Sequence, residues 1–165
     1  MFSFNSGTIP FAVIVLALAT SQAPAPDAQP DRARNTREFN LADNGLAIQG
    51  YSPVSYFTTG KPEKGDPKHA VTCRGVTYWL TSDEQVRLFN ADPSRYEPAF
   101  GGWCAYGAAI EKKFPIDPSS FKIIDGRLFL FLKNDKVDAR ELWNKEDEQS
   151  WTARAEKWWN QIAGG

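Results

Sequence analysis

Apolar and polar positions divide the chain into three stretches. Ile9–Ala19 is a continuous apolar run apart from Pro10, whereas residues 20–38 are rich in Pro, Ala and charge and hold almost no large apolar side chain. Residues 39–163 then alternate short apolar segments with polar ones. The second stretch cannot bury enough apolar surface to offset its ordering entropy, so the pattern predicts a leader, a flexible linker and one folded domain.

Within the predicted domain, short apolar segments flank Arg74-Gly75 and Asp125-Gly126, a pattern typical of tight β-hairpins. Near the C-terminus, apolar residues recur at the spacing of one helix face. That face comprises Trp151, Ala155, Trp158, Trp159 and Ile162. We therefore expect a small single α+β domain with two β-hairpins, several short helices and a longer C-terminal helix.

Two sites have the residue pattern of a helix start. Ser52 before Pro53 predicts an N-cap followed by a proline at the first helical position. Ser82-Asp-Glu-Gln85 is a capping-box pattern in front of an apolar stripe. No internal repeat is visible in the sequence.

The apolar run near the N-terminus is shorter than the roughly 20 residues that a membrane-spanning helix needs. It ends in Ala17-Leu18-Ala19, which suits signal peptidase, although no Lys or Arg precedes Ile9. The sequence thus predicts a signal peptide over 1–23 with cleavage near 19–23, a Pro/Ala-rich linker over 24–38 and a domain over 39–163. We expect a bacterial protein exported to the periplasm or beyond, with no stable membrane span after cleavage.

Composition and net charge bear on which kinds of molecule the domain binds. All six tryptophans lie in the domain, and large rings help a chain of this size to form a core. The formal net charge of −1 gives no indication of electrostatic capture of nucleic acid or anionic lipid, so we expect no nucleic-acid partner. The sequence identifies no other partner.

Cys104 is the strongest candidate for chemistry. It follows Gly101-Gly102 and precedes a predicted helix, whose first backbone N–H groups favour a thiolate and lower the thiol pKa. Such a thiol suits metal ligation or redox chemistry. The alternative is a small buried hydrophobe packed against Trp103 and Tyr106, a common role for cysteine.

The other cysteine, Cys73, lies on a predicted strand. Export to an oxidising compartment raises a possible Cys73–Cys104 disulfide. The chain has no C-x-x-C motif, which disfavours a thioredoxin-type dithiol. His69 and Cys73 lie about 13 Å apart if both are on one strand, which is too far for them to share one metal.

Several motifs together resemble the exported bacterial branch of the YHS-domain family, from about Leu46 to Leu132. The resemblance implies an envelope or periplasmic protein of poorly defined function. The motifs that carry it are Gly50-Tyr51-x-Pro53-Val54-x-Tyr56-Phe57, Gly75-x-x-Tyr78, Phe89, Pro93-x-x-Tyr96-x-Pro98, Gly101-Gly102-x-Cys104-Ala105-Tyr106-Gly107, Asp117-Pro118 and Asp125-Gly126-x-Leu128.

The family is also similar to short heavy-metal-binding modules of the TRASH type. By that resemblance, the three positions that hold thiols in those modules are Ser55, Thr81 and Gln85 here. The scaffold is thus implied, but that metal site is not.

Three hypotheses follow. The first is a non-catalytic module that holds a small ligand or a transition metal (copper, zinc or iron) at Cys104, and the sequence indicates no catalytic residue. The second is a thiol-redox protein using Cys104, alone or with Cys73, and the third is a structural or interaction scaffold. The ligand-binding residues expected under the first hypothesis are Cys104, Gly101, Gly102, Tyr106, Tyr51, Tyr56 and Tyr78.

Overall fold

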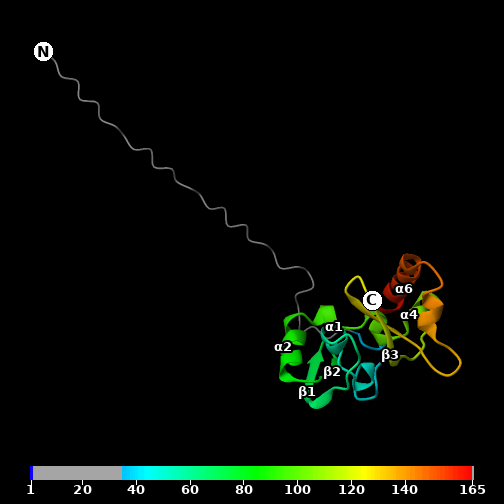
Figure 1. Ribbon diagram of the computed structural model, residues 1–165, viewed down its shortest axis with the longest axis horizontal. Coiled ribbons are helices and arrows are strands. Elements are labelled where there is room, and N and C mark those ends of the chain that lie inside the picture. Colours follow the sequence, from blue (N-terminus) through cyan, green and yellow to red (C-terminus); the bar gives the residue numbers. More distant parts are fainter. Residues whose placement is uncertain (2–34, 165) are drawn as a thin grey trace.

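The computed structural model describes Met1 and residues 35–164 and has the α+β fold that the sequence predicts. Figure 1 shows α1, α2, β1 and β2 gathered in one half of the domain and α4, β3 and α6 in the other. In chain order the elements are η1 (Ile48–Gly50), α1 (Ser55–Thr58), β1 (Asp66–Cys73), β2 (Val76–Leu80), α2 (Asp83–Ala91), α3 (Pro93–Tyr96), η2 (Ala99–Gly102), α4 (Ala105–Ala109), β3 (Asp117–Ile124), β4 (Arg127–Phe131), α5 (Ala139–Trp143) and α6 (Glu148–Ala163).

Most of the N-terminal stretch lies outside the described residues. This applies to the predicted signal segment, 1–23, except Met1, and to the predicted linker, 24–38, except its last four residues. Those last residues already contact the domain, because the Trp103 indole N–H donates to the Glu38 carbonyl at 2.6 Å. Among the described residues, no helix is both long enough and apolar enough to cross a bilayer.

Both hairpin turns form where the sequence predicts them. Arg74 and Gly75 have φ values of 49° and 87°, and Asp125 and Gly126 have values of 49° and 74°. Two consecutive left-handed residues match the right-handed twist of the flanking strands, which explains the short loops. The strands pair as two separate antiparallel sheets, β1–β2 and β3–β4.

The two hairpins also share one register, which is the first sign of an internal repeat. In each, the first residue of the leading strand pairs with the last residue of the returning strand, and a bulge follows. An aspartate and a proline begin both leading strands. The matched pairs are Asp66–Leu80 with Asp117–Phe131, and Ala70–Trp79 with Phe121–Leu130.

A left-handed turn precedes each hairpin and extends the repeat. Residues 48–50 have φ values of 50°, 53° and 78°, and residues 100–102 have values of 54°, 58° and 83°. Just after the turns, Ser52 N–H donates to the Glu63 carbonyl at 2.9 Å and Cys104 N–H donates to the Phe114 carbonyl at 3.1 Å. Residues 46–80 and 98–131 are therefore two copies of one structural unit, although the sequence shows no visible repeat.

One predicted helix start is confirmed and the other is wrong. The Ser82 hydroxyl accepts a hydrogen bond from Gln85 N–H at 3.3 Å and caps α2, as the capping box predicts. In contrast, α1 begins at Ser55, and Ser52 makes no cap. Its hydroxyl donates to the side chain of Gln85 instead, because Ser52 is buried beside α2.

The C-terminal helix packs by the face that its periodicity predicts. Trp151 and Ala155 are buried, and Trp158, Trp159 and Ile162 are half-buried. Trp151 stacks on Trp143 with ring centroids 6.2 Å apart. The helix thereby closes the core over the second structural unit.

One close approach fixes α6 against η2. A Cβ atom placed on Gly101 would lie 2.4 Å from the Trp159 ring and 3.1 Å from the Phe39 ring. Gly101 also has a left-handed φ of 58°. Glycine is thus required here both for the backbone conformation and for the space that Trp159 occupies.

We predict that Gly101→Ala destabilises the domain by about 2–4 kcal/mol, because a left-handed alanine and a displaced ring each add to the free energy of the folded state. Gly126 is the matched control: its φ is 74°, and nothing lies within 4 Å of the position that a Cβ atom would occupy there. Gly126→Ala should therefore lower stability only by the backbone contribution, about 1–2 kcal/mol. Urea unfolding of both variants checks this, and equal losses would contradict the role assigned to Trp159.

Candidate functional site

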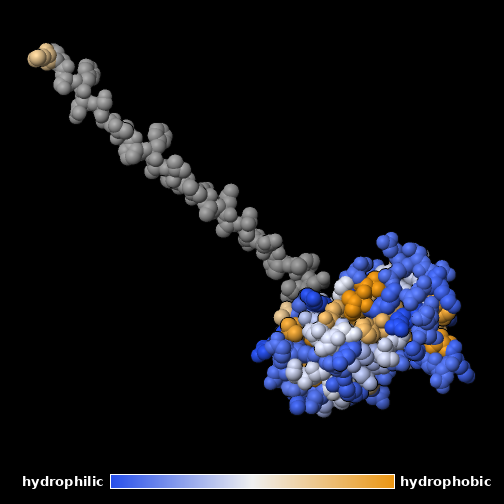
Figure 2. Space-filling model, viewed as in Figure 1, coloured by the Kyte–Doolittle hydropathy of each residue, from blue (hydrophilic) through white to orange (hydrophobic). Residues whose placement is uncertain are grey.

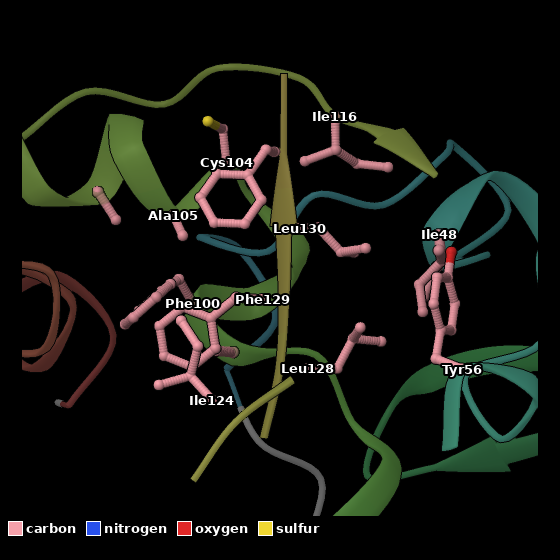
Figure 3. Packing of buried hydrophobic residues seen from close by; sticks show 14 of the residues in the cluster. Ile48, Tyr56, Phe100, Cys104, Ala105, Ile116, Ile124, Leu128, Phe129 and Leu130 are labelled. Carbon is pink, nitrogen blue, oxygen red and sulfur yellow. The ribbon is translucent and has the colours of Figure 1, made fainter. Parts of the chain in front are cut away.

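Cys104 sits where the left-handed turn η2 ends and α4 begins. Its carbonyl accepts the first hydrogen bond of the helix, from Ala108 N–H at 2.9 Å. The side chain is 0% exposed. Figure 3 shows it among the residues of the hydrophobic cluster, with Ala105 following it in the chain.

Two opposing effects act on the Cys104 thiol. Burial raises its pKa above the ordinary value of 9.0, while backbone hydrogen bonds from Leu132, Gly107 and Tyr106 pull the pKa down. The net shift is upward, because the cost of burying a charged sulfur outweighs these hydrogen bonds. The shift is opposite to the lowering that the helix start predicted, so the thiol is protonated at neutral pH.

The structural repeat gives Cys104 a counterpart, Ser52. Both residues follow a left-handed turn, both donate their N–H across to the segment before a hairpin, and both are 0% exposed. The Ser52 hydroxyl donates to Gln85 Oε1 at 2.6 Å. A small, sealed side chain at both positions indicates a packing role in the unit.

The four predicted tyrosines do not surround Cys104. The Tyr56 hydroxyl donates to the Pro118 carbonyl at 2.9 Å, and Tyr78 packs on Phe89 with ring centroids 4.9 Å apart. Both are buried, and burial, followed by the charges of Tyr51 and Asp117, raises the Tyr56 pKa far above its ordinary value of 10.0. In Figure 3, Tyr56 lies well away from Cys104.

The remaining two tyrosines are half-buried and have separate neighbours. Tyr51 lies under the Lys64 ammonium, 4.7 Å from the ring centroid. Tyr106 contacts Trp151 edge to face, with ring centroids 5.4 Å apart. The contacts of these tyrosines thus lie in both structural units, and their role in ligand binding stays a prediction.

Cys73 is buried at the end of β1, and both cysteines are free thiols in this structure. The Cys73–Cys104 disulfide stays a prediction. No group of three or more His, Cys, Asp or Glu side chains in the described part of the chain is arranged to hold a metal ion. His69 pairs with Asp83, with Nδ1 and Oδ1 3.0 Å apart, rather than with Cys73.

The three positions aligned with the thiols of TRASH modules do meet in space. Gln85 Oε1 accepts from Thr81 N–H at 3.1 Å and from the Ser52 hydroxyl at 2.6 Å. Ser55 joins the cluster because its hydroxyl donates to the Ser52 carbonyl at 2.8 Å. Side-chain and backbone polar groups thus satisfy one another in this cluster.

A groove beside η2 was not expected from the sequence. Its volume is about 180 Å³, and we call it the η2 groove. The left-handed residues Phe100 and Gly101 form one wall of it. Glu97, Pro98 and Ala99, next to these residues in the chain, also line it. The other lining residues come from separate segments: Phe39, Ser94, Arg127 and Trp159.

The charged side chains of the η2 groove are held in place. Arg127 forms an ion pair with Glu156 and lies over the rings of Phe100 and Phe129, 5.9 and 5.5 Å from their centroids. Glu97 pairs with Arg74 at 2.7 Å, and its side chain is only 10% exposed. Of the predicted site residues, only Gly101 lies in this groove.

A second groove lies beside the equivalent turn of the first unit. This η1 groove has a volume of about 210 Å³. Leu46, Ile48 and Gln49 line it, at positions equivalent to Pro98, Phe100 and Gly101. Its lining contains no charged side chain and no aromatic ring. Both grooves thus border the left-handed turns, but their chemistry differs.

No family model, curated protein or solved structure matches the chain. The resemblance to YHS-domain proteins therefore stays a prediction. Inference about function rests on the geometry of the described residues.

We predict that neither thiol reacts in the native protein, because both side chains are buried. A thiol reagent at neutral pH should modify them only at the rate of unfolding, and both should react at once in denaturant. Rapid native alkylation of Cys104, located by mass spectrometry, would contradict the sealed site.

Stability should fall at alkaline pH. The pKa values of Cys104 and Tyr56 are higher in the folded protein than in the unfolded one. The stabilisation of the folded state by these two protonated groups is therefore complete below their unfolded pKa values of 9.0 and 10.0, and it decreases as the pH rises above those values. Each group contributes a slope of about 1.4 kcal/mol per pH unit. Cys104→Ala should remove the part that begins near pH 9, measured by denaturant unfolding at several pH values, and an unchanged slope would refute this.

Proposed function

We propose that this chain is a non-catalytic binding domain of an exported, YHS-type protein, and that its ligand occupies the η2 groove rather than Cys104. The leader-like N-terminal sequence supports export, and the motifs around Gly101-Gly102 support the family. The main support for a binding site at this place is the strained backbone of Phe100, which lies in the wall of an open groove.

A left-handed φ of 54° is unusual for an aromatic residue. Such conformations raise the folded-state free energy by about 1–3 kcal/mol each and occur preferentially at ligand clamps and active sites. Here, the Phe100 ring is fixed edge to face against Phe129, with centroids 5.1 Å apart. The packing holds the strained turn at the surface of the groove, which is consistent with a preorganised site.

The lining of the η2 groove suits binding better than catalysis. Its one hydroxyl group belongs to Ser94, whose Oγ accepts from Arg74 at 3.4 Å, and no histidine or cysteine lines the groove. The Glu97 carboxylate in the same lining is paired with the Arg74 guanidinium. Aromatic walls with a few fixed polar groups are typical of small-ligand sites.

The sealed thiol weighs against the other two hypotheses for Cys104. A metal ligand has to be deprotonated and accessible to the ion, and a redox thiol has to be accessible to its oxidant. Cys104 is 0% exposed and its pKa is raised. Its position is better explained by the packing role that it shares with Ser52.

NMR with the isotope-labelled chain tests this proposal. The probes are methyl α-D-glucopyranoside, N-acetylglucosamine, glycine betaine, glutamate, citrate and spermidine, each added at millimolar concentration. We expect at least one to shift the amide signals of Phe100 and Gly101 and the Trp159 indole signal.

The matched variants are Trp159→Ala and Trp158→Ala, because these neighbours on α6 are both half-buried and only Trp159 lines the groove. Trp159→Ala should weaken binding about tenfold, since it removes an aromatic wall. Trp158→Ala should leave binding unchanged. Shifts that centre on Cys104, or no groove shift with any probe, would overturn the proposal.

A further inference from the structure

We infer that the η2 groove takes a neutral, polyhydroxylated ring of about the size of a monosaccharide. The inference rests on the proposed function and specifies its ligand class. Three properties of the groove support this inference. Its charges are balanced, one wall is aromatic, and its small volume is bordered by fixed polar groups.

Charge balance argues against an ionic ligand. Each charged side chain in the groove lining has its own counter-ion: Glu156 for Arg127 and Arg74 for Glu97. A ligand with a net charge would have to compete with one of these pairs or leave its own charge unmatched in a partly buried site. A neutral ligand avoids both penalties.

The aromatic wall suits the face of a ring. Trp159 and Phe39 meet edge to face with centroids 5.4 Å apart, and both are half-buried beside the groove. The close contact with Gly101 restricts movement of the Trp159 ring toward η2. A pyranose presents C–H groups on its faces, which pack on such a ring, and hydroxyl groups around its edge.

The polar groups suit hydroxyls, which both donate and accept. The Glu97 carboxylate accepts hydrogen bonds, the Ser94 hydroxyl does both, and the Arg127 guanidinium has N–H donors besides the Nη1 group that contacts Glu156. The volume of about 180 Å³ is below the roughly 300–1,000 Å³ typical of pockets for drug-sized ligands. One small ring therefore fits the site better than a larger ligand.

The surface offers little support for a protein partner instead. The large apolar side chains that are exposed among the described residues are Met1, Ile123 and Val137, and none lines the groove. Figure 2 shows several separate hydrophobic patches among hydrophilic and intermediate surface on the face that it draws. An interface usually needs a larger continuous apolar area.

A matched set of pyranosides tests the ligand class. The neutral probes are the methyl glycosides of glucose, galactose and mannose; methyl α-D-glucuronide supplies the anion and glucosamine the cation. We expect at least one neutral probe to shift Phe100, Gly101 and Trp159 and to bind at least about tenfold more tightly than both charged rings. Its affinity should not change when the NaCl concentration is raised tenfold.

The η1 groove and Trp158 serve as controls for this experiment. Signals from Ile48 and Gln49 should not move, because the η1 groove lacks an aromatic wall. Trp159→Ala should weaken binding about tenfold and Trp158→Ala should not.

If glutamate, citrate, spermidine, glycine betaine or a charged pyranoside occupies the η2 groove and every neutral ring fails to bind, the proposed ligand class is overturned and the proposed binding function stands. If no compound of either set shifts the groove, both fail.

Discussion

The left-handed turns at residues 48–50 and 100–102 are the constraint on which the rest of the structure depends. Each turn redirects the chain so that the N–H of Ser52 or Cys104 reaches the carbonyl of the segment that leads into the following hairpin. The same turn places the preceding residue beside the returning strand, as the parallel bridges Leu46–Thr77 and Pro98–Leu128 show. The hairpins, the short helices and both grooves are arranged around these two turns.

The second turn also controls how the domain closes. Because Gly101 has no side chain, Trp159 can lie directly against the backbone of η2, and α6 covers the second unit. The same contact places Trp159 in the wall of the η2 groove. One packing interaction thus serves both the stability of the domain and the shape of the site.

Much of the fold was predictable because the signals are local. Arg74-Gly75 and Asp125-Gly126 specify turns, Ser82 specifies a cap, and the spacing of Trp151 and Ala155 specifies a buried face. The repeat was not visible because the two units share few identical residues, chiefly the Asp-Pro pairs at the strand starts and one glycine in each turn. Left-handed Ile48 and Phe100 contradict local preference, so no local rule predicts them, and tertiary packing holds both residues in this conformation.

The site was less predictable, for the same reason. The environment of Cys104 as inferred from its neighbours suggested an activated thiol, but burial by distant segments reverses the effect on its pKa. The η2 groove joins Phe39, Ser94, Arg127 and Trp159, which no spacing rule connects. Of these, only Trp159 had been singled out, as part of a helix face that packs.

A crystal structure of the chain, soaked with the neutral pyranoside that binds most tightly, tests the central claim most directly. The account predicts a ring stacked on Trp159 beside Phe100 and Gly101, with Phe100 still in the left-handed conformation and the Cys104 sulfur unmodified and sealed. Ligand or metal density bonded to Cys104, or a relaxed, right-handed Phe100 with an empty groove, would contradict it.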